Sequence, residues 1–394
     1  MPSTKRARNE TKLDVVLVCC GEPKKSMGWF HLTQLLEHES VNVSAVVEPW
    51  FLGGGAGKPG SESFVALQKA NPNVSFCASV PEVPAGKAGA PRLFLIAGRT
   101  CDAPALFTAS LDKGATHVYI EKPGATSAAK LGELRQLASA RGVVVVVGYN
   151  KNVAEYTRDA MAMLRKSPTP LPEVTLEHCN DFPAGAELED FLRGPGGEGM
   201  LHNMCCHELA LCATLFGVET ARVNKVSIDV WRSELLHLGN DEVGKGMSDW
   251  KKVAFTLEME PPSAPPPAGS VSLPALTLTA DRCGGNFSRI RLHDAESGGH
   301  TDFRLPSAAF EKEMAAKQAA DPLIRPYFLQ QGPDYHRLKD VFISHILAGK
   351  AGIPEGVVGL DAAMEALRLA DFLVPKIKQI WAEGRPWERG VSAA

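Results

Sequence analysis

The run His117-Val118-Tyr119-Ile120-Glu121-Lys122-Pro123 decides the fold of this chain. Its apolar residues follow one another without polar alternation, which is typical of a parallel strand covered on both faces. The run then stops at a carboxylate, an amine and a proline, as expected where a buried strand ends in a loop. Further apolar runs of this kind are Leu13–Cys20, Val41–Glu48, Leu93–Ala97 and Val143–Tyr149.

Helix-like segments separate these runs, namely Trp29–Glu39, Glu62–Ala70, Ala103–Lys113 and Ala128–Arg141. In the last segment Leu131, Leu134 and Leu137 share one face, and Thr126 or Ser127 is available as a cap. Strands and helices that alternate with short connections predict an α/β fold. We therefore expect an N-terminal Rossmann domain, with a doubly wound parallel sheet, over residues 12–150.

The pattern changes after Tyr149, and residues 151–394 predict a C-terminal α+β domain with a large open, mostly antiparallel sheet. Helices are expected at Val153–Lys166, Asp334–Ala348 and Leu360–Trp381, and Pro375 is expected to kink or divide the last one. The five prolines within residues 260–269 predict a surface loop. Strand-like runs are Val174–Cys179, Arg222–Val230, Val253–Met259, Val271–Ala280 and Ser288–His293.

Composition narrows the class of protein. With 394 residues and 44% apolar content, the chain is too long for one core. A net charge of −3 does not suggest a nucleic-acid partner, and the sequence shows neither a membrane span nor a signal peptide. Residues 1–11 are interpreted as a solvated flexible tail. The odd number of cysteines, nine, favours reduced thiols in a cytoplasmic protein.

The loop after the first strand is the candidate phosphate-binding turn. It reads Gly21-Glu22-Pro23-Lys24-Lys25-Ser26-Met27-Gly28, without the middle glycine of Gly-x-Gly-x-x-Gly and longer by about two residues. Its place between a buried strand and a helix still favours a dinucleotide, and Lys24 or Lys25 would offset phosphate charge. Glu48, about 20 residues further on, would bond the ribose hydroxyls and favour NAD over NADP.

A metal site is not expected, although His202, Cys205, Cys206 and His207 carry suitable ligand atoms. Adjacent residues on a helix point about 100° apart, so these side chains cannot all face one ion.

Two segments resemble those of a known family, the glucose–fructose oxidoreductase/inositol dehydrogenase (Gfo/Idh/MocA) oxidoreductases. The first runs from Gly114 to Pro123 and contains Glu-Lys-Pro; the second, Gly196–His207, is similar to the family's Gly-rich segment ending in His. Gly148-Tyr149-Asn150 resembles the family's domain junction. The resemblance implies hydride transfer between a nicotinamide, NAD or NADP, and a sugar, polyol or related small molecule, commonly by a homodimer or homotetramer.

The resemblance also implies roles for individual residues. Lys122 would be the acid/base, which requires a lowered pKa, and Pro123 would fix its backbone. His207 would lie near the substrate, with Asn203 one helical turn before it. Glu121 would orient the amine or contact the ribose. Ala97 and Arg99 stand at a strand end where the family contacts the cofactor, and further substrate contacts are expected from Asn150, Lys151 and Arg193.

Three interpretations stay open. Asn203 stands where the family usually has Asp, and an amide cannot take up a proton. That change, the altered glycine loop and Arg99 favour a non-catalytic NAD(P)-sensing protein, whereas Lys122 and His207 favour an enzyme. A third interpretation is an enzyme of the same fold with a non-sugar substrate, such as an imine or tetrapyrrole, or with redox-neutral lyase chemistry.

Overall fold

The protein forms two compact units in the computed structural model, which describes residues 12–167, 171–194, 199–240, 246–264, 269–294 and 298–390. Of these described residues, unit 1 comprises those within 12–126, 133–148 and 318–354, and unit 2 comprises those within 127–132, 149–317 and 355–390. The expected flexible tail, residues 1–11, lies outside the described residues. The division differs from the expected one chiefly because residues 318–354 belong to unit 1 rather than to the C-terminal domain.

Unit 1 contains a parallel sheet of six strands in the order β3-β2-β1-β4-β5-β6. This confirms the predicted doubly wound sheet. Most residues of β1, β4, β5 and β6 are buried, as the unalternated apolar runs predicted. The strands are β1 (Leu13–Val18), β2 (Val41–Val47), β3 (Ser75–Cys77), β4 (Arg92–Ile96), β5 (His117–Ile120) and β6 (Val144–Val147).

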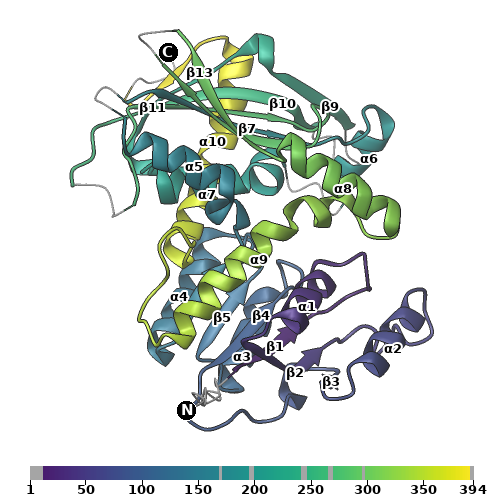
Figure 1. Ribbon diagram of the computed structural model, residues 1–394. Helices are drawn as coiled ribbons and strands as arrows, with labels where there is room; N and C mark the ends of the chain where they lie inside the picture. The colour runs from purple at the N-terminus through teal and green to yellow at the C-terminus, as the bar shows by residue number, and fades with distance from the viewer. Residues whose placement is uncertain are drawn as a thin grey trace, which may run out of the picture. The chain divides into compact units, whose positions relative to one another are not determined.

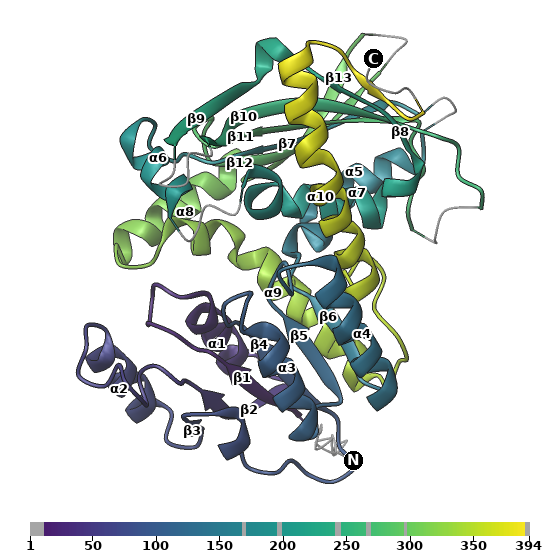
Figure 2. The ribbon, with the colours of Figure 1, turned by 180° about the vertical axis from the view of Figure 1, so that it is seen from behind.

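The helices of unit 1 include one from far along the chain. Helix α9 (Pro326–Leu347) lies beside α1 (Met27–Glu37) in Figure 1, while α3 (Ala103–Asp112) is in front in the reverse view of Figure 2. The phenyl rings of Phe30 and Phe328 stack at 5.1 Å between centroids, which fixes α9 to α1. The remaining elements are α2 (Ser61–Ala70), α4 (Ala128–Arg141), whose first residues belong to unit 2, and the 3₁₀ turn η1 (Val80–Glu82).

Unit 2 is built on an eight-stranded sheet in the order β13-β12-β7-β11-β10-β8-β14, with β9 also paired to β10. Only β7 and β11 run parallel, so the predicted mostly antiparallel sheet is confirmed. Burial alternates along β12, as expected for a sheet with one covered face. The strands are β7 (Glu173–Cys179), β8 (Val223–Ile228), β9 (Glu234–Asn240), β10 (Gly246–Met259), β11 (Ala275–Asp281), β12 (Phe287–His293), β13 (His300–Leu305) and β14 (Trp387–Glu388).

Helices α5, α7 and α10 contact this sheet, and Figure 2 shows α10 alongside it. Helix α10 continues through Pro375, so the expected division of that helix is not observed. The helices are α5 (Glu155–Leu164), α6 (Ala186–Arg193), α7 (Cys206–Leu215), α8 (Ala308–Ala320, of which 318–320 belong to unit 1) and α10 (Leu360–Glu383). Short helical turns are η2 (Asn150–Val153), η3 (Met200–Met204), η4 (Thr220–Arg222) and η5 (Val230–Arg232).

The Pro-rich loop is described in part, because residues 265–268 lie outside the described residues; residues 260–264 contain neither helix nor strand. Within the described ranges, no helix has the length and apolar character needed to cross a membrane. The nine cysteines all lie in those ranges, and each is a free thiol.

Candidate functional site

The cofactor residues predicted in unit 1 lie at the carboxyl ends of neighbouring parallel strands. The chain builds the sheet from β1 outward through β2 and β3, then returns to add β4 on the other side of β1. In doubly wound sheets, nucleotides bind at the carboxyl ends where the strand order reverses in this way. Gly21 follows β1, Glu48 follows β2, Ala97 follows β4 and Lys122 follows β5.

Gly28 allows helix α1 to pack against the end of β1. A Cβ atom at residue 28 would lie 1.9 Å from the carbonyl oxygen of Cys19. Close helix–strand packing is the role of the last glycine in a dinucleotide-binding turn. Gly21 has a φ of 69°, in the left-handed region that favours glycine. The longer loop thus keeps the close helix–strand packing at Gly28 and the left-handed backbone at Gly21, although its glycine spacing is altered.

The first turn of α1 is suited to an anion. Its N-cap residue Ser26 makes no capping hydrogen bond, and the hydroxyl instead accepts the Glu22 backbone N–H at 2.8 Å. The turn, which begins at Met27, contains no acidic residue. The amides and the positive end of the helix dipole are therefore not neutralised by a local side chain. Together with the space that Gly28 leaves, this arrangement fits a dinucleotide pyrophosphate.

The Glu48 carboxylate is hydrogen-bonded to the phosphate loop and to the turn that follows β2. Its residue is 3% exposed. One carboxylate oxygen accepts the Gly21 N–H at 2.5 Å, and the other accepts the Trp50 N–H at 3.0 Å. The structure therefore brings together Gly21 and Glu48, which were predicted separately. A ribose at this position would share the carboxylate with backbone amides.

The loop lysines are both engaged by carboxylates. Lys24 pairs with Asp321 at 2.6 Å, and Lys25 pairs with Glu22 at 2.7 Å. Both lysines are exposed enough to exchange these partners for a phosphate. Because Asp321 belongs to the segment before α9, no local sequence pattern pointed to it.

The end of β4 is more exposed than expected for a buried cofactor contact. The Arg99 side chain is 82% exposed and pairs with Asp102 at 2.9 Å. Ala97 continues the parallel ladder by donating its N–H to the Val18 carbonyl. Burial, with Glu48 adding to it, raises the pKa of the nearby Cys19 thiol to about 12 and so disfavours the thiolate.

Lys122 is partly buried and follows β5 by two residues. The Glu121 N–H bonds to the Ile96 carbonyl at 2.9 Å, so the ladder between β4 and β5 extends to the residue before Lys122. The Lys122–Pro123 peptide bond is cis, and Pro123 is buried. This places the lysine at the same end of the sheet as Gly21, Glu48 and Ala97.

The predicted catalytic pair of unit 2, Asn203 and His207, does not lie on a single regular helix. His207 is 3% exposed and lies in the first turn of α7, with its ring edge-on to Tyr149 at 5.7 Å between centroids. Asn203 lies in the preceding turn η3, a π-helical turn, and Cys205 is the N-cap of α7. The expectation that Asn203 and His207 are spaced along one α-helix is therefore wrong. Residues 196–198 of the Gly-rich segment lie outside the described residues.

A buried charged cluster in unit 2 involves Lys151, which was expected to be open to a ligand. Lys151 is instead 1% exposed and pairs with Glu208 at 2.7 Å, while His178 contacts the other oxygen of that carboxylate at 3.0 Å. Burial alone would raise the pKa of Glu208, but the attraction of His178 and Lys151 outweighs burial and lowers it. Sequence reasoning missed Glu208 and His178, although Glu208 directly follows His207.

Replacing Glu208 by Gln should lower the free energy of unfolding by about 3–5 kcal/mol, because it leaves the Lys151 ammonium buried without an anion. Since the pKa of Glu208 is lowered from 4.5, its contribution is complete above that pH and lost on acidification. In urea unfolding, the difference in the free energy of unfolding between the wild type and Glu208→Gln should therefore be smaller at pH 4 than at pH 7. The exposed ion pair between Arg193 and Glu189 supplies the control, and Glu189→Gln should lower the free energy of unfolding by about 0.5 kcal/mol or less. Equal effects of the two substitutions would contradict the prediction.

The other predicted substrate residues of unit 2 are Arg193 and Asn150. Arg193 ends α6 and donates to the Leu238 carbonyl at 2.9 and 3.1 Å, so its guanidinium also joins α6 to β9. Asn150 is fully buried in η2. Within the described residues there is no group of three or more His, Cys, Asp or Glu side chains that would hold a metal ion.

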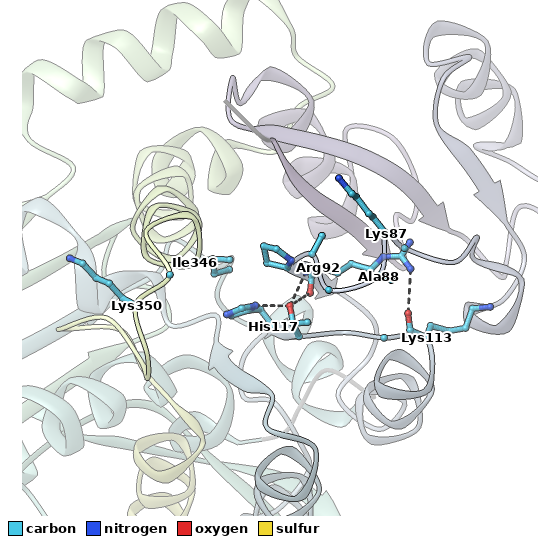
Figure 3. A pocket seen from close by; sticks show the side chains of 14 residues that line it. Lys87, Ala88, Arg92, Lys113, His117, Ile346 and Lys350 are labelled. Atoms are coloured by element: carbon cyan, nitrogen blue, oxygen red, sulfur yellow. Dashed lines mark hydrogen bonds between the residues drawn. The ribbon is translucent and has the colours of Figure 1, made fainter. Parts of the chain in front are cut away.

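A cavity of about 570 Å³ lies in unit 1 at the opposite end of the sheet (Figure 3). Its lining includes Arg92 and His117, the first residues of β4 and β5, so it is not at the ends where a dinucleotide binds. Arg92 is neutralised by Asp14 at 2.9 Å. Figure 3 shows the side chains of Lys113 and Lys350 directed away from Arg92 and His117, so these cations do not converge on a common anion.

Comparisons with known proteins agree with this architecture. Residues 54–149 match the model of the family described as "Oxidoreductase family, NAD-binding Rossmann fold" (GFO_IDH_MocA). No curated protein sequence matches the chain.

Solved structures share the fold over nearly the whole chain. A probable dehydrogenase from Thermotoga maritima has a TM-score of 0.64 at 15% identity, covering 95% of this chain and 98% of its own. A myo-inositol dehydrogenase from Corynebacterium glutamicum has a TM-score of 0.63 at 15% identity, covering 97% and 100%. A scyllo-inositol dehydrogenase from Lactobacillus casei, solved with NAD(H) and scyllo-inositol, has a TM-score of 0.64 at 12% identity, covering 96% and 99%.

The parallel sheet and the glycines of the loop after β1 are typical of an α/β domain that binds a dinucleotide. Over residues 54–149 the chain is similar to the NAD-binding Rossmann domain of the Gfo/Idh/MocA oxidoreductases, and the fold that it shares with solved dehydrogenases extends over nearly the whole chain.

Proposed function

We propose that the protein catalyses reversible hydride transfer between NAD(H) and a hydroxyl-bearing or carbonyl carbon of a polyol or sugar, with Lys122 as the acid/base. The observation that carries the proposal is the position of Lys122. It follows β5 at the same end of the sheet as the Gly21–Gly28 loop. Polyols are favoured as the substrate class because the similar structures include dehydrogenases of myo-inositol and scyllo-inositol.

The chain's residues divide the work of binding and proton transfer. The nicotinamide, when bound, supplies or accepts the hydride. The amides at the start of α1 and the lysines of the loop would hold the pyrophosphate, and Glu48 would accept from the ribose. The Lys122 amine would take the proton from the substrate hydroxyl during oxidation and return it during reduction. His207 and Asn203 would contact substrate hydroxyls through hydrogen bonds.

The test combines binding and turnover. NADH and NADPH are titrated into the protein and followed by nicotinamide fluorescence. A panel of myo-inositol, scyllo-inositol and common aldoses is then screened with NAD⁺ or NADP⁺ by absorbance at the nicotinamide band. We expect saturable NADH binding and reduction of the nucleotide by at least one polyol. If neither NADH nor NADPH binds, the proposal is overturned. Binding without turnover of any compound in the panel would favour the sensing interpretation.

Replacing Glu48 by Gln should reduce the preference for NADH over NADPH by about tenfold, or about 1.4 kcal/mol. The carboxylate repels a ribose 2′-phosphate, and the amide removes that charge while an oxygen is kept for the Gly21 N–H. Alanine is less informative, because it also leaves buried amides without an acceptor. The dissociation constants of both nucleotides provide the measurement. Glu22→Gln, in the same loop, is the control, and an unchanged ratio in Glu48→Gln would remove Glu48 from the ribose site.

A further inference from the structure

Unit 1 contains a row of ionisable side chains that ends at the residue before Lys122. The Lys339 ammonium on α9 donates to Nδ1 of His31 on α1 at 2.9 Å. Nε2 of the same imidazole contacts a carboxylate oxygen of Glu121 at 2.9 Å. His31 is fully buried, Lys339 is 3% exposed and the Glu121 side chain is 11% exposed. The row therefore runs from buried side chains toward the carboxyl end of β5.

The chemistry of the groups fixes the direction of the hydrogen bonds. An ammonium can only donate, so Nδ1 of His31 is the acceptor and Nε2 carries the hydrogen. Nε2–H then donates to Glu121, whose same oxygen also accepts the Tyr119 hydroxyl at 2.9 Å. A neutral imidazole thus connects a buried cation to a buried carboxylate.

The surroundings of the row are closed and specific. The rings of Tyr119 and Tyr335 stand edge-on to His31, with centroids at 5.4 and 5.3 Å. A Cβ atom at residue 148 would lie 2.6 Å from the Glu121 oxygen and 2.7 Å from the Tyr119 hydroxyl, so only glycine leaves room for this contact. Asp340 on α9 is the other carboxylate that acts on Lys339, and Tyr327 contacts the Tyr335 hydroxyl at 3.5 Å.

We propose that Lys339, His31 and Glu121 form a proton relay that sets the charge of Glu121 beside Lys122. A proton moves from Lys339 Nζ to His31 Nδ1, and the Nε2 proton moves to the Glu121 carboxylate. The products are a neutral amine, a neutral imidazole with hydrogen on Nδ1, and a carboxylic acid. Two N–H bonds break, and one N–H bond and one O–H bond form. The net charge of the three groups does not change. Lys339 and His31 are positioning residues that act on Lys122 through Glu121; this functional consequence rests on the proposed function.

Burial supports a relay that responds near neutral pH. It lowers the pKa of Lys339 to about 7, against the attraction of Glu121 and Asp340. Burial and the Lys339 charge lower the pKa of His31 to about 4, against the hydrogen bond and charge of Glu121. His31 therefore stays neutral while Lys339 titrates, as a relay of this kind requires.

The test uses histidine nitrogen chemical shifts of the cofactor-free protein between pH 5 and 9. In the wild type, His31 should be the neutral Nε2–H tautomer at pH 6 and its shifts should inflect near pH 7 as Lys339 loses its proton. Lys339→Met should abolish that inflection and raise the pKa of His31 by about one unit or more. Lys339→Arg keeps the cation but cannot release a proton, so it should abolish the inflection and leave His31 neutral down to pH 5.

The outcomes separate the relay from the activity. A wild type without the inflection, or a Lys339→Met protein that keeps it, would overturn the relay whether or not a substrate has been found. Lys350→Met, an exposed change in unit 1, is the control and should leave the His31 shifts unchanged. With a substrate in hand, the pH profile of kcat/KM should shift in Lys339→Met. Failure of nucleotide binding or turnover in the wild type contradicts the proposed function instead, and the shift titration still decides the relay.

Discussion

Replacing Lys122 by methionine should lower kcat/KM by about a thousandfold, while the dissociation constant of NADH changes by less than about threefold. Methionine keeps the length and the apolar part of the side chain but removes the group that exchanges a proton with the substrate hydroxyl. The backbone beside it remains fixed, since the Glu121 N–H is bonded to β4 and Pro123 is buried. The loss should therefore fall on the chemical step rather than on folding.

Steady-state rates with a substrate found in the polyol screen, together with the NADH titration, provide the measurement. Lys58→Met supplies the control, because Lys58 is an exposed lysine in a loop of the same unit. Turnover that survives undiminished in Lys122→Met would remove Lys122 from the mechanism. A parallel loss of NADH affinity would assign the residue to cofactor binding instead.

Replacing Gly28 by alanine should lower the free energy of unfolding by about 3 kcal/mol or more and weaken NADH binding at least about a hundredfold. The added Cβ would lie 1.9 Å from the Cys19 carbonyl oxygen and 2.7 Å from that of Cys20. Both contacts are with backbone, so α1 must move away from the end of β1. That movement carries the amides of the first turn away from the pyrophosphate position.

Thermal unfolding and NADH titration of the same preparation distinguish the two effects. Gly54→Ala is the matched control, because a Cβ at residue 54 would meet nothing within 4 Å. A Gly28→Ala protein that binds NADH as the wild type does would contradict the assignment of this loop to the cofactor.

The strands of unit 1 were predictable because burial on both faces leaves a direct mark on the sequence. The run at His117–Ile120 has the observed bounds of β5, and the helix Ala128–Arg141 has those of α4. Strands and helices with weaker marks were missed. Strand β3 has three residues, and β13 is largely exposed, so neither shows a long or alternating apolar pattern. Helix α9 was expected to begin at Asp334, yet it begins at Pro326 and continues through Pro333.

Candidate site residues could be predicted from the sequence where the residue type and its place in the chain indicate a role. Glycines at a turn, a carboxylate at a strand end and a lysine before proline each indicate a role by residue type and place. The partners of these residues carry no such signal, because they come from distant segments. Asp321, which pairs with Lys24, and Lys339, which contacts His31, lie on the segment that joins unit 1 from residue 318 onward.

By itself, the sequence determined the class of fold, because the pattern of apolar residues reports how each strand is buried. It also determined the end of the sheet at which the chemistry is expected. The stretch from His117 to Pro123 contains both pieces of information. Only the tertiary structure decided which charges are buried together. It turned Lys151 from an expected ligand contact into the buried partner of Glu208, and it joined Glu121 to His31 and Lys339. Pairings of this kind depend on distances between segments far apart in the chain, and a linear pattern of residues does not specify those distances.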